Sequence, residues 1–407
     1  MKKSAALYLS AREASAELAI SPATLYAYVS RGLIRSEPTS DSRSRRYRAE
    51  DVRTLKERRT PSQDPRGLRN FDADLPVLDS TIATITPDGP IYRGVSCIEL
   101  AEADTLEHAA TLLWDVTDVD PFAADNCPHV SAEMRAVADA ARHAAPIDRT
   151  IAVLALAASA DPGAFTRAPD GRAMVGGRIV RLVVATMLNA RSSPQPLHLQ
   201  IARRWAPNDK RAADLIRRAL VLLADHELNA STFTVRCAAS TGLNLFDSVI
   251  AGLVALKGPK HGGASVLAAQ TLKTLADGDV AHLVRERVAL GERFAGFGHG
   301  VYKHGDPRAR ALLDALARAG AAPKLVREIP DRIAEATGEF VNIDYALAVL
   351  LHVLGQVPGY APGNELVLFA MARTVGWIAH ASEQWQSGRV IRPRARYTGP
   401  APRGSAS

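Results

Sequence analysis

Cysteine is scarce in this chain of 407 residues: only Cys97, Cys127 and Cys237 occur, and they stand far apart. They form no CxxC pair, and no histidine cluster with metal-ligand spacing accompanies them. This pattern argues against a disulfide framework and against a zinc site. We therefore expect three reduced thiols in a cytosolic protein.

Aromatic residues and long apolar runs are also scarce, with aromatics at 5% of the chain. The most apolar stretches, such as residues 151–160, are far shorter than a membrane span and are bounded by charged residues. No long apolar segment follows Lys2 and Lys3, so the N-terminus does not resemble a signal peptide. These absences predict a cytoplasmic protein without a membrane segment. The plentiful alanine and leucine favour helices over sheets.

Positive charge is concentrated at one end of the chain. The net charge is +7, and residues 1–70 hold 15 Lys and Arg against 8 Asp and Glu, which leaves 35 of each sign in the remainder. The length allows a large core with a small appendage. We expect only the cationic N-terminal part to face a polyanion.

Two short helices with a tight turn between them are predicted near the N-terminus. Ser10 and Glu13 have the spacing of a capping box, which would start a helix that runs through Leu18. Ser21 and Pro22 are a second N-cap with proline at the first helical position. This arrangement is typical of a helix-turn-helix, whose second helix enters the major groove of DNA.

A β-hairpin wing is predicted over residues 33–47, and a third helix over residues 49–59. Arginines at positions 43, 45, 46 and 48 would pair with phosphates. The segment resembles the MerR-type or excisionase-like winged helix-turn-helix, which implies DNA binding through residues 1–60. The alternative is that these helices dock on a protein and the arginines form a solvated face.

A linker is predicted over residues 61–75, because residues 60–69 contain two prolines and a glycine without apolar periodicity. Beyond it, helical periodicity dominates residues 105–114, 132–145, 179–188 and 212–225. Asp88, Gly89 and Pro90 predict a turn between two short extended pieces. The expected fold class is all-α, with the helical stripes forming a core.

Polar and glycine-rich clusters interrupt these helices and carry the candidate chemistry. His226 opens a polar cluster after one apolar helix, and His261 and His299 stand among glycines. Glycine lets the backbone approach a ligand closely and is costly elsewhere. Asp344 stands between apolar residues, where burial would raise its pKa and make it a usable base.

The order and identity of these clusters resemble those of the citrate synthase family. The likeness runs from about residue 80 to residue 399. Its motifs are Tyr92-Arg93-Gly94, an HExNxST box at 226–232, GPxHGGA at 258–264, GFGHxVYKxxDPRA at 296–309, the NVD-like Asn342-Ile343-Asp344, ARTxGWxAH at 372–380, and the closing RPxxxYxG from Arg392.

The resemblance implies an acyltransferase that condenses acetyl-CoA or propionyl-CoA with oxaloacetate and then hydrolyses the thioester. Asp344 would be the general base, His261 the donor to the enolate oxygen, and His299 the donor to the ketone. It implies no tightly bound cofactor and no metal, with the CoA thioester as a substrate.

Four further residues would bind the carboxylates of the oxo acid and product, namely His226, Arg308, Arg373 and Arg392. Arginine suits this role because its planar fork makes two parallel bonds to a carboxylate. In the family, the residue that matches Arg392 comes from the neighbouring subunit, which implies a homodimer.

The resemblance also implies a catalytic region over residues 76–407. Its large helical domain would comprise about 76–261 and 341–400, and its small domain about 262–340, with a cleft that closes over the substrate. Two departures stand out. Gly300 replaces a common arginine, and Tyr345-Ala346 replaces an aromatic pair, which we expect to reshape the wall near the acyl group.

A function of a different class remains open from the sequence: a DNA-binding regulator whose synthase-like domain senses a metabolite. The N-terminal segment motivates this hypothesis, and Gly300 lends it slight support. The presence of Asp344, His261 and His299 argues against it, because a pure sensor needs no base.

Overall fold

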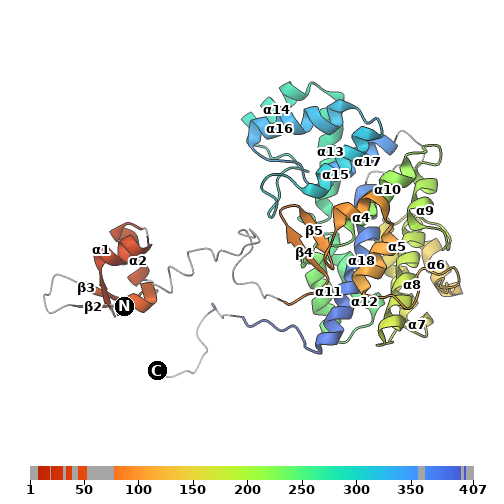
Figure 1. Ribbon diagram of the computed structural model, residues 1–407, viewed down its shortest axis with the longest axis horizontal. Coiled ribbons are helices and arrows are strands. Elements are labelled where there is room, and N and C mark those ends of the chain that lie inside the picture. The colour runs from red at the N-terminus through yellow and green to blue at the C-terminus, as the bar shows by residue number, and fades with distance from the viewer. Residues whose placement is uncertain are drawn as a thin grey trace. The chain divides into compact units, whose positions relative to one another are not determined.

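The computed structural model describes residues 8–18, 20–30, 34–38, 45–52, 78–355, 363–395 and 398–399. The chain divides into two units, Met1–Phe71 and Asp72–Ser407, which are described separately (Figure 1). The linker expected at 61–75 lies outside the described residues.

The N-terminal unit contains a small antiparallel sheet with strand order β1-β3-β2. Leu18, Leu25, Ile34, Tyr47 and Val52 lie in its core. Its elements are β1 (Tyr8–Ser10), α1 (Ala11–Leu18), α2 (Pro22–Ser30), β2 (Ser36–Pro38) and β3 (Arg45–Arg48).

The helix starts predicted for this unit are confirmed. The Ser10 N–H donates to the Glu13 carboxylate at 2.8 Å, and the Glu13 N–H donates to Ser10 Oγ at 3.3 Å. Ser21 Oγ accepts from the Thr24 N–H at 3.2 Å. Strands β2 and β3 form the predicted wing, although its loop lies outside the described residues. Of the third helix, residues 49–52 are described and helical.

The wing arginines already have acidic neighbours within the unit. Arg46 lies 3.1 Å from the Glu37 carboxylate and stacks over the Tyr8 ring at 4.4 Å. Arg48 lies 3.8 Å from the same carboxylate, and Arg35 forms a 2.7 Å pair with Asp51. These exposed pairs are weak, so the arginines can exchange partners at little cost.

The second unit is mostly helical and opens with a small antiparallel sheet, β4-β5-β6. A turn at residues 87–88 joins its first two strands, so the turn expected at residues 88–90 is confirmed with a small shift, and Gly89 and Pro90 belong to the second strand. The strands are β4 (Ala83–Thr86), β5 (Gly89–Tyr92) and β6 (Val95–Ser96). The first helices are α4 (Cys97–Ala103), α5 (Leu106–Trp114), α6 (Ala132–Ala140), α7 (Pro146–Ala160), α8 (Pro169–Met187), α9 (Leu197–Trp205), α10 (Ala212–Leu223), α11 (Ala230–Ser240) and α12 (Leu245–Leu256).

The remaining elements are α13 (Gly263–Asp277), α14 (Val280–Ala289), α15 (Pro307–Arg318), the short π-helix η1 (Lys324–Glu328), α16 (Ile329–Thr337), α17 (Ile343–Leu354) and α18 (Asn364–Ser387). Helices α13 to α16 gather at one end of the unit, and α18 runs through its middle (Figure 1). Residues 262–340, the expected small domain, form this end group. Its independent movement remains a prediction.

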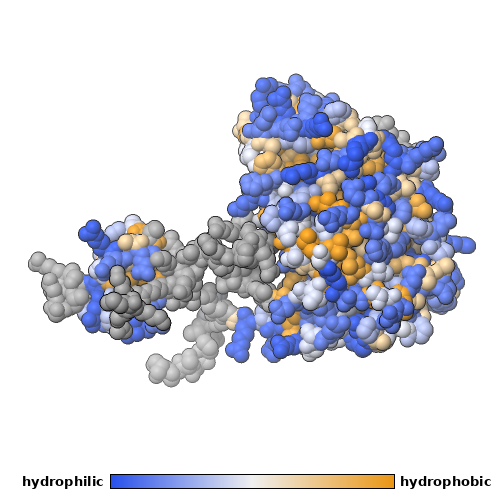
Figure 2. All heavy atoms as spheres, in the orientation of Figure 1, coloured by the Kyte–Doolittle hydropathy of each residue, from blue (hydrophilic) through white to orange (hydrophobic). Residues whose placement is uncertain are grey.

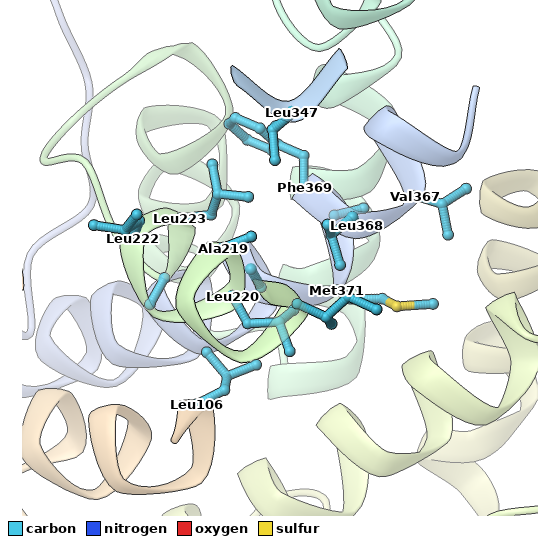
Figure 3. Close-up of a cluster of buried hydrophobic side chains, with 14 of the residues drawn as sticks. Leu106, Ala219, Leu220, Leu222, Leu223, Leu347, Val367, Leu368, Phe369 and Met371 are labelled. Carbon is cyan, nitrogen blue, oxygen red and sulfur yellow. The ribbon is translucent and has the colours of Figure 1, made fainter. Parts of the chain in front are cut away.

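A cluster of buried apolar side chains joins α10, α17 and α18 (Figure 3). Leu220 and Leu223 of α10 and Leu368 of α18 are fully buried in it. Burying one such side chain contributes about 1.5–3 kcal/mol. The cluster therefore fixes the end of α10 against the first half of α18, where the site residues begin. Hydrophilic residues cover most of the outer helices in the view of Figure 2.

Glycine is required where the loop before α15 touches its neighbours. Gly296 has φ +88°, and a Cβ there would lie 2.9 Å from Tyr345 Cβ and 3.1 Å from Ala268 Cβ. Its carbonyl accepts from the Asn342 N–H at 2.9 Å. The backbone of this loop is thus packed directly on α17 and α13.

Within the parts of the chain that the structure describes, no helix is both long and apolar enough to cross a membrane.

Candidate active site

The loop after α10 carries His226 and is held by buried contacts. The Tyr92 hydroxyl lies 3.1 Å from both the N–H and the carbonyl oxygen of Asp225. Glu227 has a left-handed φ of 54°, and its N–H donates to Asp225 Oδ1 at 2.8 Å. A Cβ on Gly376 would lie 2.4 Å from Asp225 Oδ2, so only glycine lets α18 approach this loop.

His226 and His299 meet around Tyr302. The two imidazole rings are 5.6 Å apart, and His226 Nε2 lies 3.3 Å from the Tyr302 hydroxyl. Nδ1 of His299 accepts from the N–H groups of Val301 and Tyr302, at 3.0 and 3.3 Å. A neutral His299 therefore carries its proton on Nε2, which makes that atom a donor.

His261 is held by Ser231, a residue that the sequence analysis did not single out. His261 Nε2 lies 2.9 Å from Ser231 Oγ, which also accepts from the indole N–H of Trp377 at 3.3 Å. Ser231 Oγ lies 2.9 Å from Asn229 Oδ1 as well. The Ser231 hydroxyl can donate its one proton either to His261 Nε2 or to Asn229 Oδ1. When it donates to His261 Nε2, the proton of the neutral imidazole is on Nδ1.

Asn342 connects the His299 loop to Asp344. As the N-cap of α17, its Oδ1 accepts from the Asp344 N–H at 3.0 Å. Its amide nitrogen donates to the Gly298 carbonyl at 2.9 Å. The residue before His299 and the first turn of α17 are thus held by one side chain.

Arg308 is buried in a two-point ion pair with Asp306. Its Nε and one terminal nitrogen lie 3.0 and 2.7 Å from the two carboxylate oxygens. Asp306 also caps α15 and accepts from the Ile343 N–H at 3.2 Å. A buried pair of this kind needs such additional bonds to offset its lost hydration.

Arg373 differs from Arg308 because its terminal nitrogens are unpaired. Its side chain is fully buried, its Nε donates to the Leu223 carbonyl at 2.9 Å, and its guanidinium stacks on Phe369 at 4.6 Å. The two terminal nitrogens have no hydrogen-bond partner among the described residues. They are suited to a planar anion such as a carboxylate.

Burial sets the protonation states of the site. It raises the pKa of Asp344 to about 6, against the opposing charges of Arg308 and Arg373. It lowers the pKa of His261 and of His299 to about 4, with further lowering by Arg373 and Arg308 respectively. At neutral pH the site therefore contains a carboxylate and neutral imidazoles.

The two arginines also show which predicted residues lie together. Burial, Arg308 and Arg373 lower the pKa of His226 well below its usual range. The same two charges act on the pKa of Asp344. The structure thus brings six of the predicted site residues together: His226, His261, His299, Arg308, Asp344 and Arg373.

The seventh predicted residue, Arg392, lies elsewhere in this chain. It is exposed in the segment after α18. The neighbouring Ile391 N–H donates to Ser240 Oγ at 3.1 Å. Ser240 ends α11 and Ser231 lies near its start, about 14 Å away at 1.5 Å per residue. Its expected role across a dimer remains a prediction.

The structure also locates the two departures from the family pattern. Gly300 is exposed, and a Cβ there would meet nothing within 4 Å. Tyr345 and Ala346 are fully buried, and the Tyr345 hydroxyl donates to the Leu325 carbonyl in η1 at 2.7 Å. Tyr345 therefore connects α17 to η1, and the effect of the pair on the acyl group remains a prediction.

Two other features do not coincide with this cluster. A small pocket is lined by Arg93, Trp114, Arg172 and Glu383, among others, and by none of the six residues. Among the described residues, no group of three His, Cys, Asp or Glu side chains is placed to hold a metal ion.

The fold and the site define a helical protein that combines a carboxyl group with a raised pKa, neutral imidazoles and two buried arginines. A sequence model described as "Citrate synthase, C-terminal domain" matches residues 68–394. The chain belongs to the citrate synthase family.

Curated relatives include citrate and 2-methylcitrate synthases. "Citrate synthase 2" of Bacillus subtilis is 38% identical over 195 residues, which cover 46% of this chain and 51% of that protein. The chain spans about half the length of the first relatives it matches. "2-methylcitrate synthase 1" of Corynebacterium glutamicum is 29% identical over 83% of this chain and 96% of its own length.

Solved structures of citrate synthases share the fold. That from Thermotoga maritima matches with a TM-score of 0.67 and 26% identity, covering 82% of this chain and 96% of its own. A ternary complex from Thermoplasma acidophilum, with carboxymethyl coenzyme A and oxaloacetate, matches with a TM-score of 0.66 and 26% identity over 82% of this chain and 97% of its own. Residues 9–60 match a MerR HTH family regulatory protein, so the chain carries a MerR-like helix-turn-helix domain.

The two buried arginines should respond differently to loss of charge. Arg308→Met leaves Asp306 buried and unpaired, which we expect to cost about 3–5 kcal/mol. Arg373→Met removes a cation whose terminal nitrogens are unpaired, and should cost about 1 kcal/mol for the lost bond to Leu223. Thermal unfolding of both variants tests this. Equal losses of stability would contradict the assignment of Arg373 to a ligand.

Proposed function

We propose that this protein condenses acetyl-CoA or propionyl-CoA with oxaloacetate, giving citrate or 2-methylcitrate and CoA. The observation that carries the proposal is a carboxylate with a raised pKa, Asp344, which shares two buried arginines with three neutral imidazoles. This is the set of groups that abstraction of a weakly acidic C–H proton and addition of the resulting enolate require.

In the first step, Asp344 takes a proton from the carbon next to the thioester carbonyl. The electron pair moves onto the carbonyl oxygen, and His261 donates a hydrogen bond to it. Ser231 supports this role, because a proton donated from its hydroxyl to His261 Nε2 leaves the donor on Nδ1. A neutral donor suits the enolate because it stabilises charge without protonating the carbon.

In the second step, the enolate carbon attacks the ketone carbon of oxaloacetate. His299 donates a hydrogen bond from Nε2 to the ketone oxygen and stabilises the developing alkoxide, which takes up one proton in place of the proton that Asp344 removed. Arg308, Arg373 and His226 bind the carboxylates and orient the ketone. A water molecule then hydrolyses the thioester, which releases the CoA thiol and leaves a new carboxylate.

We further propose that the active form is a homodimer. Arg392 is exposed and lies at the far end of α11 from Ser231, so it is available to a neighbouring copy. Arg392 of the partner subunit would then complete each carboxylate site. The substrates are the acyl-CoA and oxaloacetate, and the proposal includes no tightly bound cofactor.

We also propose that residues 1–60 bind DNA, as the MerR-like match and the surplus of positive charge suggest. Tyr26 of α2 is 55% exposed and available to a groove. A regulator that only senses a metabolite is the less favoured alternative, because such a protein has no use for the base Asp344.

A substrate panel tests the main proposal. Purified protein with oxaloacetate and either acetyl-CoA or propionyl-CoA should release CoA, measured with a thiol reagent. Asp344→Asn should reduce kcat about 10³-fold, in the range of general base catalysis, without unfolding the protein. Absence of CoA release from the wild-type protein with both thioesters would contradict the proposal.

The pH dependence of kcat/KM should report Asp344. The carboxylate acts as a base only when deprotonated, so the rate should be constant above pH 7 and fall tenfold per pH unit below about 6. His261 and His299, with pKa values of about 4, should add no limb between pH 5 and 8. A profile of kcat/KM whose only decrease is centred near pH 4 would contradict the assignment of Asp344 as the base.

Gel shift of the full chain on duplex DNA of mixed sequence tests the second activity. Binding should weaken steeply as salt rises, because phosphate contacts release counterions. The experiment is repeated with oxaloacetate present to detect coupling. Absence of salt-sensitive binding would exclude the DNA role.

A further inference from the structure

A line of buried polar side chains leads away from the site along α18. His380 is fully buried, with Nε2 3.1 Å from Asp225 Oδ2 and Nδ1 3.4 Å from a terminal nitrogen of Arg236. Arg236 is fixed by Glu383 at 2.5 Å and by Gln384 Oε1 at 3.0 Å. We call Asp225, His380 and Arg236 the relay.

The hydrogen-bond donors and acceptors along the relay can be assigned. Arginine can only donate, so Nδ1 of His380 must accept from Arg236, and the ring proton is on Nε2, facing Asp225. The Nε2 and Oδ2 atoms are close but not aligned for a hydrogen bond, and neither has another hydrogen-bond partner among the described residues. At 3.1 Å, a small rotation of the His380 ring brings these two complementary buried atoms into a hydrogen bond.

Asp225 joins the relay to the site. Its Oδ1 accepts from the Glu227 N–H and holds the left-handed turn that follows His226. Its negative charge also opposes the effect of burial on the pKa of Arg373. Both carboxylate oxygens therefore face donors. Asp225 supports the turn that follows His226, and its carboxylate packs against Gly376 of α18, the helix that carries Arg373.

We propose that Asp225 and His380 are positioning residues for the oxo-acid side of the active site, an inference that rests on the proposed function. They hold the turn after His226, and the contact of this turn with the helix that carries Arg373, in the arrangement that binds the carboxylates. The acyl-CoA side depends on Asp344 and His261, which the relay does not contact directly.

Three variants separate this role from packing. Asp225→Asn places an amide N–H against a donor in either orientation. His380→Gln keeps the direction of the relay, because its amide oxygen can accept from Arg236 and its amide nitrogen can donate to Asp225. His380→Leu fills similar space with neither group.

We expect Asp225→Asn and His380→Leu to raise the KM for oxaloacetate about tenfold, the effect of losing one hydrogen bond to a charged group. The KM for the acyl-CoA should change less than twofold, and His380→Gln should stay within threefold of wild type for both. Arg178→Lys is the matched control. Arg178 forms a two-point pair with Asp161 at 2.7 and 2.8 Å, and its loss should lower Tm while leaving both KM values unchanged.

Equal KM values for the Leu and Gln variants of His380, or parallel changes in both KM values, would overturn the proposal. If the wild-type protein releases no CoA, the proposed function fails. The role of the relay is then tested by measuring the affinity of the same variants for oxaloacetate by calorimetry. Nitrogen-15 NMR of labelled histidines, with the His380 signal assigned by its loss in His380→Gln, gives a reading independent of activity. The Nε2–H tautomer is expected, and Nδ1–H would refute the relay.

Discussion

The buried ion pair between Asp306 and Arg308 is the contact on which the site depends. Asp306 caps α15, binds the Arg308 guanidinium at two points and accepts from the N–H of Ile343. It therefore fixes the starts of α15 and α17 relative to each other. The loop with His299 and the helix with Asp344 are set by the same carboxylate, and Asn342 reinforces the connection.

Burial and the two arginines act differently on the acid and on the imidazoles. Burial disfavours any charged form, so it raises the pKa of Asp344 and lowers those of His261 and His299. The positive charges of Arg308 and Arg373 lower these pKa values, so they partly offset the rise at Asp344 and add to the fall at His261 and His299. The result is a separation of pKa values that leaves one carboxylate base beside neutral donors at neutral pH. In the proposed reaction, that separation provides an acid and a base at the same carbon–carbon bond.

Local signals in the sequence were reliable where they depend on nearby residues. The capping pairs at Ser10 and Ser21 and the helix from Ala212 are present in the structure, and the turn expected at residues 88–90 lies at residues 87–88. The environment of Tyr345 was not readable from the motif. Successive residues on a helix point about 100° apart, so Tyr345, next to Asp344, is buried and its hydroxyl donates to the Leu325 carbonyl.

The sequence by itself determined the family, the helical character, the MerR-like domain and the candidate site residues, because these follow from residue types at short spacings. Only the tertiary structure decided the tautomer of neutral His299, the direction of the pKa shift of Asp344, the pairing of Arg308 and the contacts of Ser231 and Asp225. Those properties depend on burial and on neighbours that are distant in the chain. Folding brings six of the predicted residues together within one chain, whereas Arg392 lies apart from them in the exposed segment after α18.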